Sequence, residues 1–244
     1  NSCVITNEEG WYKKALDTDL ARPKFAIMNP EITYTLPDYQ TQCGCADIMM
    51  HTMERYFVLE DTMEITDKIA QDVMKNVMKY AKILKKDPEN YEARAEIMWC
   101  GSLSHNGLTG CGTCGGDWAT HLIEHELGGM FDVAHGAGLA AVWGSWARYV
   151  MDEKPERFAQ FAVDVMGVEE SDDVKSTALK GIEAVEEFYR MIEMPTNMKE
   201  LGINPTDEQI KDMAMKATNH DTQQLGAFKK LSAKDLVEIY KTAK

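Results

Sequence analysis

Residues Thr62 to Leu84 read TMEITDKIAQDVMKNVMKYAKIL and show the clearest periodicity in the chain. Their apolar side chains recur at intervals of three and four residues, at Ile65, Ile69, Val73, Val77, Tyr80 and Ile83. This spacing places them on one face of an α-helix, with charged residues on the other face. The preceding segment, Gln40–Val58, has the same kind of spacing. The fold is therefore expected to be built from amphipathic helices packed on their apolar faces.

The rest of the chain continues this helical pattern. Helices are expected at Asn90–Leu103, Asp117–Met130, Ala137–Met151, 155–167, 171–192, 205–218 and 233–244. Start signals precede two of them, at Ser171-Asp172-Asp173 and at Thr206-Asp207-Glu208. Only residues 1–34 favour strands, at Val4–Thr6, Phe25–Met28 and Ile32–Tyr34. The sequence predicts a mainly α protein, an all-helical domain preceded by short strands.

Composition excludes several function classes. The 244 residues include 26 Lys and Arg against 40 Asp and Glu, a net charge of −14. Nucleic acids and anionic membrane surfaces require clustered cations, so neither is expected as a partner. The apolar runs are too short to span a bilayer. Six cysteines in a chain of this size do not form a disulfide framework, and no secretory signal opens the sequence, so a cytoplasmic setting is expected.

Two pairs of residues have the spacing of metal ligands. Asp47 and His51 lie four residues apart in a predicted helix, and His121 and His125 repeat that spacing in another. Side chains at i and i+4 lie on one helix face, so each pair can approach one ion. His135 follows at a glycine-bounded break. Both pairs lie in apolar segments, where buried charges need partners.

The second pair supports two interpretations. His121-x-x-Glu124-His125 has the H-x-x-E-H pattern of one class of zinc metallopeptidases, in which both histidines bind zinc and the glutamate activates water. In the other interpretation His121 and His135 are ligands, and His125 is free to handle protons or substrate. Only the second interpretation also uses the pair Asp47 and His51.

A family resemblance extends over essentially the whole chain. Asn29–Pro37 (NPEITYTLP), Ala46-Asp47-x-x-x-His51, His121-x-x-x-His125 and His135-Gly136 resemble, in order and spacing, the iron-containing (group III) alcohol dehydrogenases. The segments Glu89–Arg94 and Asp117–His121 look most like the branch of butanol dehydrogenases and NADPH-dependent aldehyde reductases. This resemblance implies a dehydroquinate-synthase-like fold, with an N-terminal dinucleotide-binding domain, a helical C-terminal domain, and a metal between them.

The resemblance also implies roles for individual residues. Asp47, His51, His121 and His135 match the four metal ligands, and His125 matches an additional active-site histidine near the substrate. Lys13 and Thr35 match positions that approach the cofactor. The implied reaction is hydride transfer between primary alcohols or aldehydes and NAD(P)(H), assisted by a divalent Fe²⁺ or Zn²⁺ that polarises the substrate oxygen. The implied assembly is a homodimer.

One part of the family pattern is absent from this sequence. The glycine-rich GGGS turn that binds the cofactor phosphates does not occur, and Gly115-Gly116-Asp117 follows no predicted strand. Residues 1–34 are therefore expected to be the end of the dinucleotide-binding domain, and residues 35–244 the metal-binding domain. NAD(P)(H) would be bound largely by the missing part. A further alternative is a truncated metal-binding helical domain that has no catalytic activity by itself.

The remaining candidates are expected to be structural. Cys111 and Cys114 form a single CxxC, without the βαβ context of a redox motif or the second CxxC of a zinc knuckle. His105 and His220 are expected to be polar residues at loops or helix ends.

Overall fold

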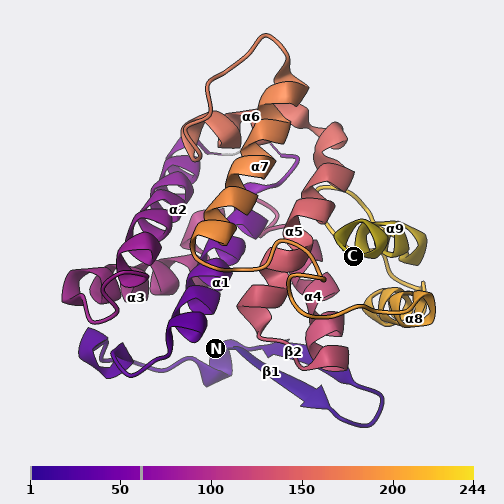
Figure 1. Ribbon diagram of the computed structural model, residues 1–244, viewed down its shortest axis with the longest axis horizontal. Coiled ribbons are helices and arrows are strands. Elements are labelled where there is room, and N and C mark those ends of the chain that lie inside the picture. The colour runs from indigo at the N-terminus through magenta and orange to yellow at the C-terminus, as the bar shows by residue number, and fades with distance from the viewer. Residues whose placement is uncertain (1, 61–62) are drawn as a thin grey trace.

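The computed structural model describes residues 2–60 and 63–244 as a helical bundle with a small hairpin on one side (Figure 1). The α-helices follow one another along the chain as α1 (Asp38–Tyr56), α2 (Glu64–Leu84), α3 (Tyr91–His105), α4 (Ala119–Phe131), α5 (His135–Val150), α6 (Pro155–Asp164), α7 (Val174–Met191), α8 (Asp207–Ala217) and α9 (Ala233–Ala243). Each predicted helix is present, with ends within a few residues of the expected ones. Among the described residues, each helix is too short or too polar to span a lipid bilayer.

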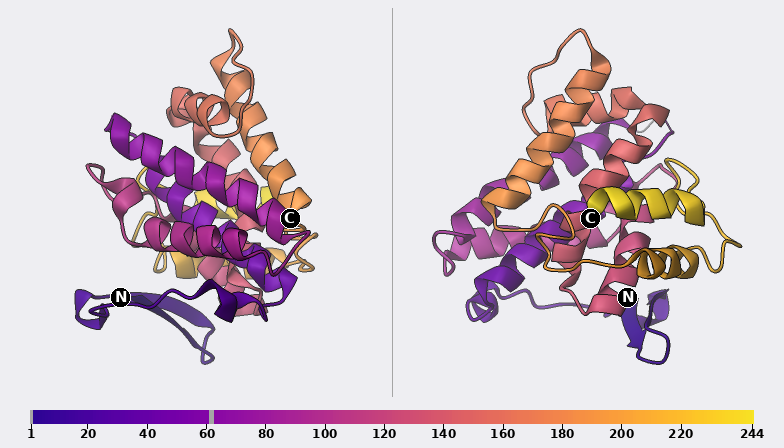
Figure 2. Two further views of the ribbon diagram at one scale, coloured as in Figure 1. Left: turned by 90° about the vertical axis from the view of Figure 1, so that its left-hand side faces the viewer. Right: turned by 45° about the vertical axis from the view of Figure 1, so that its right-hand side comes forward.

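The N-terminal segment forms an antiparallel hairpin. Strand β1 (Ser2–Asn7) pairs with β2 (Tyr12–Asp17), with Val4 opposite Ala15. The strand expected at Val4–Thr6 is confirmed, whereas β2 was not predicted because its sequence, YKKALD, lacks apolar alternation. The hairpin lies along the lower edge of the bundle, beside the end of α4 (Figure 2).

Two of the predicted strands are wrong. Residues 25–28 form no strand. Residues 32–34 fall at a short 3-10 helix, η2 (Pro30–Thr33), and the turn after it. Pro30 occupies the first turn of η2, and the Asn29 side chain accepts a hydrogen bond from the Glu31 N–H. This proline and cap favour a helical turn more strongly than the β-branched residues favour a strand.

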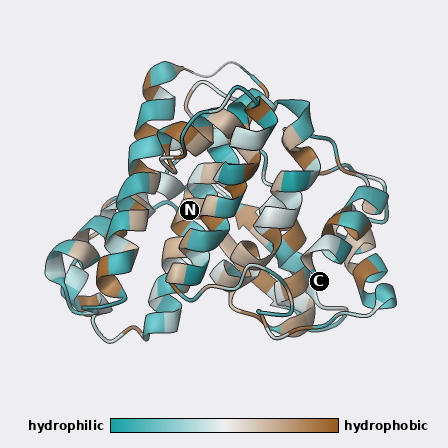
Figure 3. Cartoon of the chain, turned by 45° about the horizontal axis from the view of Figure 1, so that its top comes forward, coloured by the Kyte–Doolittle hydropathy of each residue, from teal (hydrophilic) through white to brown (hydrophobic). Residues whose placement is uncertain are grey.

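The core lies between α1, α5, α6 and α7. Phe57, directly after α1, is fully buried and stacks on Phe158 of α6 with ring centroids 4.3 Å apart. Trp143 and Trp146 of α5 pack around Phe57. Burying an aromatic side chain of this size contributes about 1.5–3 kcal/mol. Hydrophilic and hydrophobic bands alternate around the helices (Figure 3), as the amphipathic periodicity predicts.

Helix ends are fixed where the sequence predicts start signals. The Asp173 side chain accepts a hydrogen bond from the Lys175 N–H at the start of α7. Thr206 and Gln209 form a reciprocal capping box at the start of α8. Such caps stabilise a helix by about 1 kcal/mol.

A glycine allows α5 to approach α1. A Cβ on Gly136 would overlap the carbonyl oxygen of Cys43. This close approach brings the first turn of α5, which begins at His135, against the middle of α1, where Asp47 and His51 lie.

Candidate metal centre

Asp47 and His51 form the first half of the cluster, on one face of α1. Asp47 Oδ1 lies 3.6 Å from His51 Nε2, as the i, i+4 spacing predicts. Both side chains are largely buried, at 26% and 18% exposure.

Two further histidines reach the same carboxylate oxygen from other helices. His121, in the first turn of α4, places Nε2 3.6 Å from Asp47 Oδ1, and His135, at the start of α5, places Nε2 3.7 Å from it. Asp47 Oδ1 and His121 Nε2 are buried and form no hydrogen bond among the described residues. Buried polar atoms are normally satisfied. The ligand atoms of Asp47, His51 and His121 all lie within 4.8 Å of one another, and His135 approaches the same carboxylate oxygen from α5. This set of one carboxylate and three imidazoles fits a divalent cation.

The charges of the cluster are strongly coupled. Burial alone would raise the pKa of Asp47, but His105 and His121 hold it well below its usual range. Burial alone would lower the pKa of His121, but the hydrogen bond to Glu54 and the negative charges of Glu54 and Asp47 raise it to about 9, so without an ion the ring is protonated near pH 7. Burial, together with the neighbouring His121, lowers the pKa of His51 to about 2. The cluster therefore retains a negative Asp47, as a cation site requires.

Glu54 orients His121 and was not identified from the sequence. It lies two turns after Asp47 on α1, and its Oε1 is 3.0 Å from His121 Nδ1. With Nδ1–H donating to this carboxylate, Nε2 is the nitrogen that faces Asp47, and an ion bound there would replace the proton on Nε2. Carboxylates behind histidine ligands are the usual second layer of metal sites. The seven-residue interval from Asp47 is the one signal that could have identified Glu54.

Glu124 contacts the Nδ1 side of the His135 ring, as Glu54 does for His121. Its Oε2 hydrogen-bonds His135 Nδ1, and it forms an ion pair with Lys13 of β2, whose Nζ lies 3.2 Å away. Glu124 is fully buried. Because this carboxylate is engaged by His135 and Lys13, it is not free to activate a water between His121 and His125. This arrangement does not favour the metallopeptidase interpretation.

His125 lies beside the cluster rather than around Asp47. Its ring centroid is 5.7 Å from that of His135, and its side chain is buried. Burial lowers the pKa of His125 to about 4, so the ring is neutral near pH 7. A neutral imidazole has one donor and one acceptor nitrogen, as a proton carrier requires.

His105 lies closer to the site than the sequence indicated. It is the last residue of α3, at a helix end as expected. Its ring stacks on His51, with centroids 3.7 Å apart, and its Nε2 is 3.7 Å from Asp47 Oδ2. It was not identified because no short spacing relates it to the other histidines.

The other predicted residues lie in different surroundings. Thr35 is exposed in the turn after η2. Cys111 and Cys114 are free and exposed in the glycine-rich segment before α4. His220 is exposed between α8 and α9.

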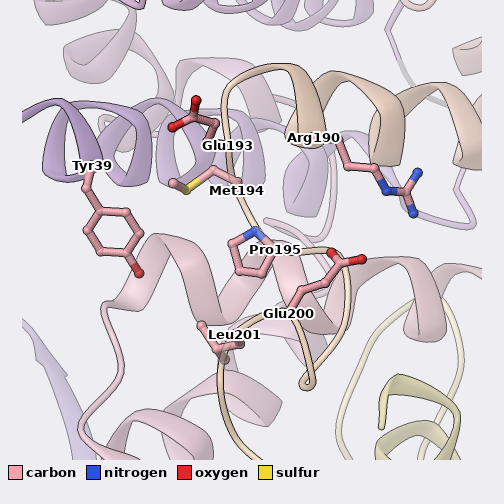
Figure 4. Close-up of a pocket in the computed structure, with 7 residues that line it drawn as sticks. All are labelled: Tyr39, Arg190, Glu193, Met194, Pro195, Glu200 and Leu201. Carbon is pink, nitrogen blue, oxygen red and sulfur yellow. The ribbon is translucent and has the colours of Figure 1, made fainter.

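A separate pocket of about 290 Å³ lies where the start of α1 meets the segment between α7 and α8 (Figure 4). It is lined by Tyr39, Arg190, Glu193, Met194, Pro195, Glu200 and Leu201. None of these residues belongs to the histidine cluster.

Comparison with known proteins gives consistent results. Residues 41–244 match the C-terminal part of the Fe-containing alcohol dehydrogenase family. The chain is 34% identical over 239 residues to NADH-dependent butanol dehydrogenase A of Clostridium acetobutylicum, covering 98% of this chain and 61% of that protein. It is 31% identical over 242 residues to the NADPH-dependent aldehyde reductase YqhD of Escherichia coli, covering 99% of this chain and 61% of that protein.

Solved structures agree with this match. The crystal structure of an NADH-dependent butanol dehydrogenase A from Thermotoga maritima superimposes with a TM-score of 0.92 at 34% identity, covering 99% of this chain and 61% of that one. The chain thus spans about three fifths of the length of these relatives.

Proposed function

Because the chain belongs to the Fe-containing alcohol dehydrogenase family, we propose that it is the metal-binding part of an oxidoreductase that interconverts primary alcohols and aldehydes with NAD(P)(H). The names of the butanol dehydrogenase and the aldehyde reductase support this substrate class. NADH-dependent and NADPH-dependent relatives occur at similar identity, so both nicotinamides are compatible with the family.

The proposed ligands are Asp47, His51, His121 and His135, holding a divalent Fe²⁺ or Zn²⁺. The main support for this proposal is that the Nε2 atoms of three histidines lie 3.6–3.7 Å from the same oxygen, Asp47 Oδ1. This oxygen is buried and has no hydrogen bond among the described residues. Such an ion supplies Lewis-acid polarisation of an alcohol or carbonyl oxygen.

The surrounding residues have complementary roles in this proposal. Glu54 and Glu124 hold the rings of His121 and His135 in the tautomer that directs Nε2 inward. His125, neutral and buried beside His135, would carry the proton that leaves the alcohol or reaches the aldehyde oxygen. Its removal would slow proton transfer more than it weakens metal binding.

We assign residues 1–34 to the end of the dinucleotide-binding domain and residues 35–244 to the metal-binding domain. Lys13 supports a location at the boundary, because its Nζ joins the hairpin to Glu124 of α4. Approach of Lys13 and Thr35 to the nicotinamide cofactor, and assembly as a homodimer, rest on the family resemblance. A binding assay with NAD(P)H tests the alternative that this chain is a metal-binding domain with no catalytic activity by itself. Saturable binding at micromolar concentrations to the 244-residue chain would contradict that alternative.

The decisive experiment is the metal content of the purified chain, wild type against Asp47→Ala. The matched control is Asp72→Ala, which removes a highly exposed carboxylate from α2. We expect Asp47→Ala to lose most of the bound iron or zinc and the control to keep it. Full occupancy in Asp47→Ala would contradict the proposed ligand set.

A further inference from the structure

We propose that His105 is an additional protein ligand for the ion held at Asp47, a donor outside the four-residue set carried by the family motif. This inference rests on the proposed metal site. His105 Nε2 lies 3.7 Å from Asp47 Oδ2, while the Nε2 atoms of the other three histidines surround Oδ1. The two oxygens of one carboxylate are therefore both faced by imidazole nitrogens.

The hydrogen bonds of His105 determine which nitrogen carries the proton. Nδ1 lies 2.9 Å from the carbonyl oxygen of Gly101, which only accepts hydrogen bonds, so the proton is assigned to Nδ1. Ser104 Oγ is 2.7 Å from Nδ1 and donates its own proton to the same Gly101 carbonyl, so it too accepts from Nδ1. In the neutral ring, Nε2 then carries a free electron pair.

This assignment places two acceptors face to face. In the neutral ring with its proton on Nδ1, the electron pair of His105 Nε2 and the Asp47 carboxylate face the same region, 3.7 Å apart. Two such groups repel one another unless a cation lies within reach of both. Imidazole and carboxylate are both common ligands of iron and zinc.

The position of His105 is fixed by the fold rather than by a mobile loop. Arg55 of α1 donates hydrogen bonds to the carbonyl oxygens of Ser104 and His51, so the end of α3 is tied to α1 beside the site. Gly101 lets the two helices approach, since a Cβ there would lie 3.3 Å from Ile48. The His105 ring consequently rests on that of His51.

A competing arrangement has His105 protonated on both nitrogens and donating to Asp47 Oδ2. It would then act as a hydrogen-bond donor and positioning residue, without binding the ion. The variants His105→Ala and His105→Gln separate the two arrangements. Glutamine can donate an amide proton toward Asp47 but offers no imidazole nitrogen. His220→Ala, which removes an exposed histidine between α8 and α9, is the matched control.

The test uses the 244-residue chain loaded with Co²⁺ alone. Proton NMR counts the paramagnetically shifted ring N–H signals of bound histidines, and competition with a chelator gives the Co²⁺ affinity. We expect His105→Ala and His105→Gln each to lose one shifted N–H signal and to bind Co²⁺ more weakly by about tenfold or more. We expect His220→Ala to match wild type.

Three outcomes would contradict the inference, and they are distinguishable. An unchanged signal count in His105→Ala, or wild-type affinity in His105→Gln, would overturn the role of His105 as a ligand while leaving the Asp47 site intact. Failure of the wild-type chain to bind Co²⁺ would overturn the metal site and this inference together.

Discussion

Glu54 Oε1 accepts two hydrogen bonds from the same residue, one from the backbone N–H of His121 and one from its ring Nδ1, each at 3.0 Å. The backbone bond satisfies an N–H in the first turn of α4, which has no partner within the helix. The ring bond fixes the direction of Nε2. One buried carboxylate on α1 thus sets both the start of α4 and the orientation of a proposed ligand.

Replacing Glu54 by glutamine is expected to weaken metal binding without removing a ligand. The amide oxygen can still accept both hydrogen bonds, but the negative charge behind the His121 ring is lost. Outer carboxylates of this kind typically contribute a factor of 10–100 in metal affinity. We expect Glu54→Gln to lower zinc affinity by about tenfold, measured by competition with a chelator. Glu187→Gln, on an exposed position of α7, is the control; equal affinities in the two variants would refute the role of Glu54.

Adding one methyl group at Gly136 is expected to disturb the site through the backbone. A Cβ there would overlap the Cys43 carbonyl, so α5 must move away from α1. We expect Gly136→Ala to lower the free energy of unfolding by about 1–3 kcal/mol, as overpacking does. It should also weaken metal binding, because His135 adjoins the contact.

Gly44 provides the matched control for this experiment. It lies in α1 beside Cys43, and a Cβ there would meet no atom within 4 Å. Gly44→Ala should therefore raise stability by about 0.5–1 kcal/mol, the usual gain from removing a helical glycine. Thermal unfolding measures the stability of both variants. If Gly136→Ala were as stable as Gly44→Ala, α5 would have adapted to the added methyl group.

The helices and their order could be predicted because they depend on local periodicity. The apolar periodicity from Ile65 to Ile83 predicted α2, and the caps at Asp173 and Thr206 predicted the starts of α7 and α8. The buried face of α2 includes Val73, Val77 and Tyr80 of that stripe, whereas Ile65 is 63% exposed. The strand predictions for residues 25–28 and 32–34 were wrong. At 32–34 the β-branched residues do not outweigh Pro30 and the Asn29 cap, which favour the helical turn of η2. β2 was missed because its pairing with β1 is fixed across the turn rather than by its own pattern.

Within the site, the sequence identified residues with helical spacing but not those brought together by packing. Asp47 and His51 could be paired by their interval of four. Glu124 lies one residue before His125, yet it acts on His135 across the break between α4 and α5. His105 reaches Asp47 only because Gly101 and Arg55 draw α3 onto α1. Such contacts depend on helix packing, which no interval in the sequence encodes.

Glu126 of α4 is expected to make stability depend on pH. Its side chain is buried, 3% exposed, and burial raises its pKa from 4.5 to about 7. Below pH 4.5 both the folded and the unfolded chain hold this proton, so the residue contributes no pH dependence. Between pH 4.5 and 7 the unfolded chain releases the proton while the folded chain keeps it, so the fold loses stability as pH rises.

Between pH 4.5 and 7 the burial of Glu126 lowers the free energy of unfolding by about 3 kcal/mol, and this loss is complete above pH 7. Glu126→Gln cannot ionise, so its stability relative to wild type should rise by about that amount between pH 4 and pH 8. Urea unfolding of both proteins across this range measures the difference. Glu187→Gln is the control, because it makes the same substitution at an exposed position of α7. A constant difference between wild type and Glu126→Gln would show that nearby lysines, Lys14 and Lys216 among them, keep the carboxylate ionised in the folded chain.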